Sequence, residues 1–180
     1  QDETFGIGMN GEITAVTFGL YAQEDITAAD GSIIPADGLL EIVSVDENGQ
    51  AMCKTDLPFG SFYLKELSTD SHCLLNGETF PFSFEYGGPS LAVVEIAANN
   101  GEAVSNELIR GEIRGLKTDE NGTGLSRAVI GLFQSDETEF TAENALATAT
   151  SAEDGSFSFA DVPFGDWVLK ELESPAGFIL

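Results

Sequence analysis

Basic residues are scarce in this sequence. Against 31 aspartates and glutamates it has 7 lysines and arginines, which gives a formal net charge of −24 at pH 7. Nucleic acids and anionic membranes carry charge of the same sign, so neither is expected as a partner. A hydrophobic content of 42% is too high for a disordered acidic tail. The charge is therefore expected on the solvated surface of a folded protein.

Long apolar runs, a signal sequence and a cysteine framework are also missing. No apolar run approaches the ~20 residues that cross a bilayer, and the N-terminus lacks the regions of a secretory signal peptide. The sequence starts at Gln1 rather than Met, which indicates a piece of a longer chain. Cys53 and Cys73 match no zinc or redox spacing, and either a disulfide or two free thiols is open. No metal or cofactor is predicted.

Histidine occurs once, at His72, between Ser71 and Cys73. Neighbouring residues of a strand face opposite sides, so these three are not a catalytic arrangement, and no enzyme acting on other molecules is predicted. The acidic turns 46–49 and 119–122 are too short for a calcium loop and are better explained as hairpin turns.

An internal repeat organises the chain. The motif Asp56-Leu57-Pro58-Phe59-Gly60, followed by Leu64-Lys65-Glu66-Leu67, returns as Asp161-Val162-Pro163-Phe164-Gly165 and Leu169-Lys170-Glu171-Leu172. The two copies align without a gap as far as Leu75 and Leu180. A repeat of this kind predicts a tandem array, here with domains at residues 1–109 and 110–180.

Short strand patterns separated by Asn-Gly and Asp-Gly turns dominate both copies. The candidate strands include 16–21, 39–45, 80–86 and 91–96. The stretch 139–149 is only weakly helical and is predicted to be a loop. The predicted fold class is all-β, with two tandem antiparallel β-sandwiches.

One glutamate in each copy stands in an apolar strand. The period of two puts Phe62, Leu64 and Glu66 on one face, and Trp167, Leu169 and Glu171 on the equivalent face. If this face is the core, burial favours the neutral acid. The opposite face, which begins with Tyr63 and Val168, could form the core instead, and periodicity does not decide between them.

Further motifs lie in the second copy. They are Lys117-Thr118-Asp119, Gly131-Leu132-Phe133, Asp154-Gly155-Ser156-Phe157-Ser158-Phe159 and Lys170-Glu171-Leu172-Glu173-Ser174-Pro175-Ala176-Gly177-Phe178. In this order and spacing, residues 111–180 resemble the Cna-B (SpaA-type, prealbumin-like) domains of Gram-positive pilins and surface adhesins. The first copy resembles them more weakly, through Phe18-Gly19-Leu20-Tyr21 and its Pro-Phe-Gly strand.

In that family a first-strand lysine and a last-strand asparagine condense to an isopeptide bond, assisted by a glutamate on a middle strand. The resemblance implies Lys117 as donor and Glu171 as assisting acid in the second copy. In the first copy it implies Glu66 as the acid and Asn106 as the acceptor. With the resemblance, we expect the aromatic face to be the core, which buries Glu66 beside Phe62 and Leu64, and Glu171 beside Trp167 and Leu169. A buried lysine becomes nucleophilic, and a neutral acid can carry protons to the leaving nitrogen.

Each copy departs from that pattern. No lysine precedes Lys54, and Phe5 or Gly6 occupies the donor position in an expected first strand at 4–9. We therefore expect no cross-link in the first copy, where Glu66, as a buried acid without a partner, is expected to be replaceable without loss of stability. The second copy aligns only to Leu180, so Asn106 has no counterpart in the printed sequence. Its open sheet edge is expected to pair with a strand of another copy.

The function implied by the resemblance is that of a stalk or adhesin module of a secreted or wall-anchored surface protein. Its expected partners are the neighbouring domains of the same protein. The alternative is a ligand-binding tip module that recognises a host protein or carbohydrate through its loops. The loop 24–39, with Asp25, Asp30 and Asp37, is the candidate for that role.

Overall fold

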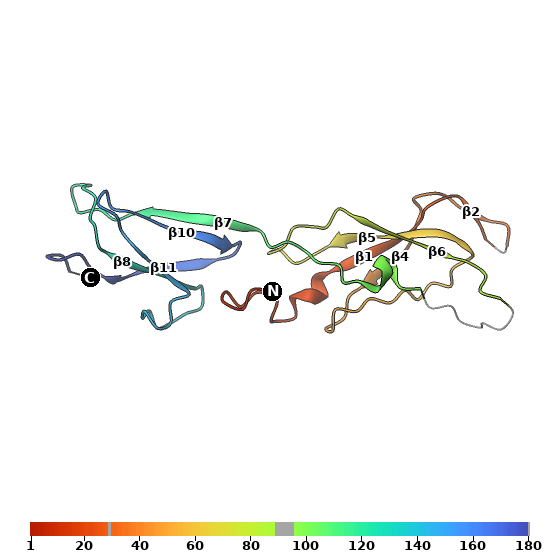
Figure 1. The fold of residues 1–180 in the computed structure, drawn as a ribbon, viewed down its shortest axis with the longest axis horizontal. Helices are drawn as coiled ribbons and strands as arrows, with labels where there is room; N and C mark the ends of the chain where they lie inside the picture. The colour runs from red at the N-terminus through yellow and green to blue at the C-terminus, as the bar shows by residue number, and fades with distance from the viewer. Residues whose placement is uncertain (29, 89–95, 180) are drawn as a thin grey trace. The chain divides into compact units, whose positions relative to one another are not determined.

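The computed structural model describes residues 1–28, 30–88 and 96–179, which are β-strands and connections apart from two short 3-10 turns (Figure 1). The strands are β1 Thr17–Ala22, β2 Ile26–Thr27, β3 Ile33–Ile34, β4 Leu39–Ser44, β5 Gly60–Ser68, β6 Thr79–Phe84, β7 Arg110–Leu116, β8 Val129–Gln134, β9 Ala147–Thr150, β10 Ser156–Pro163 and β11 Trp167–Glu173. The 3-10 turns are η1 Glu12–Ala15 and η2 Ala98–Gly101. The all-β class predicted from the sequence is confirmed.

The chain divides into two compact units. Gly8–Glu107 forms one, here called the inserted unit. Gln1–Ile7 and Leu108–Leu180 together form the other, here called the terminal unit. The N-terminal seven residues, which the repeat assigns to the first copy, thus belong with the second.

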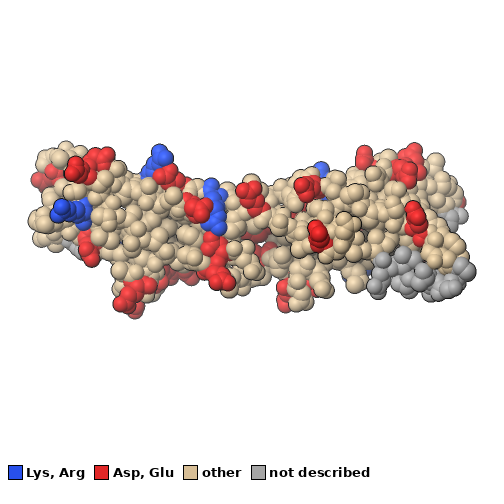
Figure 2. All heavy atoms as spheres, in the orientation of Figure 1, with Lys and Arg blue, Asp and Glu red and all other residues tan. Residues whose placement is uncertain are grey.

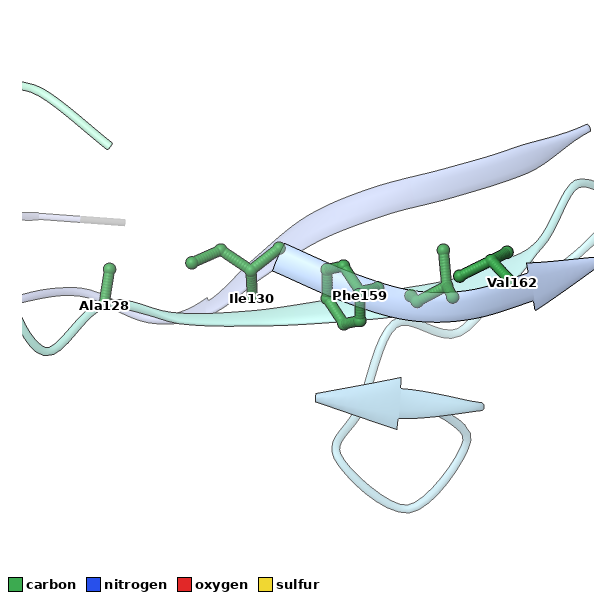
Figure 3. Packing of buried hydrophobic residues seen from close by; sticks show 5 residues of the cluster. Ala128, Ile130, Phe159 and Val162 are labelled. Carbon is green, nitrogen blue, oxygen red and sulfur yellow. The ribbon is translucent and has the colours of Figure 1, made fainter. Parts of the chain in front are cut away.

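Two antiparallel sheets build the terminal unit: β10-β7 and β11-β8-β9. Leu132 on β8 and Phe159 and Val162 on β10 are at most 5% exposed and pack into one cluster. Figure 3 shows side chains from β8 and β10 in this contact. Because the cluster draws on both sheets, the terminal unit is a sandwich with its core between them.

A four-stranded antiparallel sheet, β4-β1-β5-β6, forms the body of the inserted unit, beside a two-stranded sheet, β2-β3. The sheet buries Leu20 and Phe62 completely, with Ile26 of β2 packed against them. A second cluster around Phe18 and Phe80 continues the core along the same sheet.

The predicted core face of the repeated strand is confirmed in the first copy, where Phe62 is 0% and Glu66 1% exposed. In the second copy Trp167 packs against the core, but the prediction is wrong for Leu169, which is 37% exposed. The difference has a local reason. Leu64, the equivalent of Leu169, packs in a cluster with Val104, whose equivalent in the alignment of the two copies lies beyond the printed sequence.

Three strand predictions are confirmed with end shifts of one or two residues, at β1, β4 and β6. The predicted strand 91–96 falls, except for Ile96, outside the described residues. Residues 4–9 are not a strand, because they form turns closed by a bridge between Asp2 and Ile7. The predicted loop 139–149 is wrong at its end, where β9 begins at Ala147.

The acidic residues lie as expected at the surface. On the face drawn in Figure 2, aspartates and glutamates are scattered over both units rather than gathered in one patch, and lysines and arginines are few. Glu66 is the exception, because it is the only charged residue in the buried set of the described chain.

Candidate functional site: the glutamate of each repeat

In the terminal unit, a lysine and a glutamate from different sheets meet. Lys117 directly follows β7, and Glu171 lies on β11. Lys117 Nζ donates to Glu171 Oε2 at 2.9 Å, and the two side chains are 29% and 21% exposed. The ion pair therefore links the two sheets of the sandwich at a partly shielded position, where it is screened less than on an open surface.

The backbone of Lys117 is anchored on both sides. Its N–H donates to Gly155 O and its carbonyl accepts from Leu125 N, each at 2.8 Å. Gly155 has φ 84°, and a Cβ there would lie 2.2 Å from the Lys117 carbonyl oxygen. Only glycine fits this turn, so the Asp154-Gly155 pair fixes the point from which the lysine side chain projects.

The second oxygen of Glu171 is buried and has no hydrogen-bond partner among the described residues. A buried oxygen without a donor is costly, and such positions are rare in folded proteins. Glu171 Oε1 is thus a buried acceptor that no described group satisfies.

In the inserted unit, the equivalent glutamate has an amide as its partner. Asn106 Nδ2 donates to Glu66 Oε1 at 2.9 Å and to Oε2 at 2.8 Å, and also to Leu74 O at 3.0 Å. The Asn76 N–H donates to Glu66 Oε2 at 2.5 Å. The expectation that Glu66 is a buried acid without a partner is therefore wrong, since both of its oxygens are hydrogen-bonded.

A bulge follows the glutamate in both units. The pairing of β5 with β1 shifts between Glu66 and Ser68, and that of β11 with β8 shifts between Glu171 and Glu173. A bulge bends the strand and re-aims the side chains next to it. The bulge was not predicted from the sequence. Its only signal there is the gapless alignment of Leu67 with Leu172.

The structure thus brings together two of the predicted residues in each unit. Glu66 contacts Asn106, and Lys117 contacts Glu171. The expected donor position of the first copy lies elsewhere, because Phe5 packs against Trp167 in the terminal unit. Asn76 is the partner that sequence reasoning missed.

The other acidic candidates stabilise their own turns. Asp46 Oδ1 accepts from the Asn48 and Gln50 N–H groups, and Asp119 Oδ1 accepts from Asn121 and Thr123 in the same way. These hydrogen bonds, first those from Gln50 and Thr123, lower the pKa of each aspartate. Both turns are thus held by side-chain caps of the Asx type.

In the candidate binding loop 24–39, the acids are similarly engaged. Asp25 accepts from Ala36 N at 2.8 Å, Asp30 from Ser32 N at 2.9 Å, and Asp37 from the Tyr63 hydroxyl at 2.9 Å. Their hydrogen bonds shape the loop and its contact with β5.

Cys53 and Cys73 are free thiols, and burial raises the pKa of both, which opposes nucleophilic chemistry. His72 also has a partner, which the sequence did not predict: its Nδ1 lies 2.5 Å from Asp70 Oδ1 in the turn after β5.

Within residues 1–28, 30–88 and 96–179, no three metal-binding side chains gather at one point. No helix in these ranges is long and apolar enough to span a membrane.

Comparison with solved structures finds three that are similar to this chain. The Bacillus anthracis TIE protein is similar with a TM-score of 0.61 and 21% identity, over 89% of this chain and 26% of that one. A streptococcal ancillary pilin has a TM-score of 0.36 and 21% identity, over 92% of this chain and 50% of that one. BcpA, the major pilin subunit of Bacillus cereus, has a TM-score of 0.33 and 10% identity, over 93% and 86%.

The chain spans about a quarter of the TIE protein, and the likeness between them concerns the fold. No curated protein matches the chain. A family model does match: SpaA, described as a prealbumin-like fold domain, over residues 111–180. This match confirms, for residues 111–180, the resemblance to SpaA-type prealbumin-like domains that the sequence motifs indicated.

Proposed function

We propose that this chain is a structural module of a Gram-positive surface protein or pilus, located outside the cell. The SpaA match over residues 111–180 and the sandwich of the terminal unit support this proposal. Its partners are the neighbouring domains of the same protein or further subunits. No external substrate is turned over.

Within this role, Lys117 is the donor and Glu171 the assisting acid of an isopeptide bond in the terminal unit. The observation that carries the proposal is a comparison of the two glutamates. Glu66 binds an asparagine amide with both oxygens, whereas Glu171 binds the amine of Lys117 with one oxygen and leaves the other, buried, without a partner. An asparagine amide at Glu171 Oε1 would complete the three reacting groups.

The chemistry follows from these contacts. Glu171 takes a proton from the Lys117 ammonium, and the free amine attacks the asparagine Cγ to form a C–N bond. The Cγ–Nδ2 bond breaks as the acid gives its proton to the leaving nitrogen, and the attacking nitrogen loses its second proton to the Glu171 carboxylate. The ammonia formed departs with that proton as ammonium, which leaves Glu171 ionised. Fixed proximity in a shielded site supplies the effective concentration for this single turnover.

A graft tests the proposal. Residues 76–108 are appended after Leu180, where the alignment of the two copies places them. The intact mass should fall by one ammonia, about 17 Da, relative to the sequence mass. Lys117→Ala should keep the full mass, and Glu171→Gln should slow the loss. The matched control replaces the grafted asparagine by alanine.

The chain without the graft should have the full sequence mass, because the inserted unit has no lysine donor near Glu66. A grafted chain that gains thermal stability but keeps the full mass would rule out Lys117 as the donor. A mass loss in the ungrafted chain, traced to Lys54 or Lys65 joined to Asn106, would contradict the assignment of the first copy.

A further inference from the structure

One end of the terminal sandwich carries a docking surface. The surface is defined here as Arg110, Gln134 and Trp167, from the start of β7, the end of β8 and the start of β11. Antiparallel pairing sets Arg110 beside Pro163 in one sheet and Trp167 beside Gln134 in the other. Trp167 Nε1 donates to Pro163 O at 2.9 Å, which joins the two sheets at this end. Its occupant is the chain's own segment 1–7, whose red trace lies near the start of β11 in Figure 1.

Contacts of three kinds hold the segment. Asp2 Oδ2 pairs with Arg110 Nη2 at 2.7 Å, and the Asp2 side chain is only 13% exposed. The Gln134 side-chain amide donates to Phe5 O at 2.8 Å. The Phe5 ring meets Trp167 edge-on, with centroids 5.1 Å apart and an interplanar angle of 72°. This combination of ionic, polar and aromatic contacts is specific to one register of the segment.

The segment is also closed on itself. Asp2 and Ile7 exchange backbone hydrogen bonds of 2.9 and 3.0 Å, and Phe5 N donates to Asp2 Oδ1 at 3.2 Å. Ile7 is 6% exposed and Phe5 packs against the core cluster of the sandwich. The loop therefore lies on the docking surface as a compact unit that must detach as a whole.

Chain connectivity gives this arrangement a mechanical consequence. The inserted unit joins the terminal unit by covalent bonds at both of its ends, before Gly8 and after Glu107. Tension applied between Gln1 and the C-terminal end of the chain thus enters the terminal unit through the docked segment. It reaches residues 8–107 only after the segment detaches.

We propose that residues 1–7 are a clasp that carries tension directly into the terminal unit and shields the inserted unit from load. The proposed surface role supplies only the source of the tension. The clasp also accounts for a difference between the units: the inserted unit, where no lysine of the described residues pairs with Glu66, is the one that bears no load. The clasp proposal can fail while the isopeptide assignment stands, because the clasp is tested by unfolding force and the isopeptide bond by intact mass.

Single-molecule pulling tests the clasp, with Cys53→Ser and Cys73→Ser in every variant. The chain is held by tags at its two ends. Unfolding of the inserted unit lengthens the chain by roughly 350 Å, at about 3.3–3.6 Å per residue, so its step is recognised.

The force at which this step first occurs should fall when Asp2→Ala and Phe5→Ala together remove the ionic and aromatic contacts of the clasp. Glu3→Ala, an exposed change in the same segment, should leave the force unchanged. Urea unfolding of the inserted unit should have the same midpoint in the parent and in the double variant, which shows that the unit itself is intact. A step force that is the same in the double variant as in the parent, or one that Glu3→Ala lowers equally, would overturn the proposal.

Discussion

Glu66 and Glu171 show how one residue type acquires two environments. Both follow an apolar alternation and precede a bulge, but Glu66 is 1% exposed and bound by an amide, whereas the Glu171 side chain is 21% exposed and bound by an amine. The partner, rather than the strand, distinguishes them. The consequence for stability is different in the two units.

Replacing Glu66 by leucine should destabilise the inserted unit by about 1–3 kcal/mol, because the amide of Asn106 and the N–H of Asn76 lose their acceptor in a closed site. Glu66→Gln should cost less, since one oxygen remains to accept. Urea unfolding measures the free energy. Lys65→Leu, on the exposed side of the same strand, is the control. A Glu66→Leu variant as stable as the parent would mean that these hydrogen bonds contribute nothing net.

Acid should loosen the clasp. The hydrogen bond from Arg110 lowers the pKa of Asp2 below its ordinary value. A lowered pKa in the folded state means that the stabilisation is complete above the pKa of the free aspartate and is lost as the pH falls through the folded value. The stability difference between the parent and Asp2→Asn should therefore be present at pH 6 and vanish in strong acid. A difference independent of pH would exclude the ion pair as its source.

At the scale of the strand, glycine and aromatic residues act in pairs. A Cβ on Gly115 of β7 would lie 2.1 Å from the ring of Phe157, its partner on β10. Within a single strand, the ring of Tyr21 lies over Gly19 on β1 and the ring of Phe133 lies over Gly131 on β8. An aromatic ring lying over a strand glycine restores the apolar contact that the glycine lacks. These glycines are therefore part of the packing rather than breaks in the strands.

Gly115→Ala should destabilise the terminal unit by about 1–3 kcal/mol, since the Phe157 ring must leave its place. Gly111→Ala is the matched control, because it lies in the same strand and its added Cβ meets no atom within 4 Å among the described residues. Thermal unfolding followed through Trp167 gives the comparison. Equal melting temperatures for the two variants would show that the ring adjusts without cost.

Local patterns predict much of the strand content, and long-range contacts explain the failures. β1, β4 and β6 follow from alternation and turn residues. Alternation places Phe62 and Glu66 on one face, and the family resemblance is needed to choose that face as the buried one. Residues 4–9 do not, because their conformation depends on Trp167 and Arg110, far along the sequence. In the candidate site, the motifs point to the residues that meet, but not to the bulges or the Asn76 N–H, which depend on strand register.

For the whole molecule, closure of the terminal unit requires its most distant segments to meet. The bonds Arg110–Asp2 and Gln134–Phe5 span 108 and 129 positions. Contacts of such separation form slowly, because loop closure costs entropy before the contact repays it. Refolding followed by the emission of Trp167, the only tryptophan, should show a late phase that Phe5→Ala removes. Glu3→Ala should keep the late phase, which would identify that phase with docking of the segment. A late phase that persists in Phe5→Ala would belong to another folding event.

The order of synthesis adds a consequence to the docked segment. Residues 1–7 leave the ribosome before the surface that receives them, and the entire inserted unit is made in the interval. Phe5 and Ile7 therefore wait without their final partners until Trp167 and the last strand of the terminal unit have been completed. During that wait, a neighbouring molecule that has already been finished offers the same surface, so crowded production of this protein favours exchange of the first seven residues between copies.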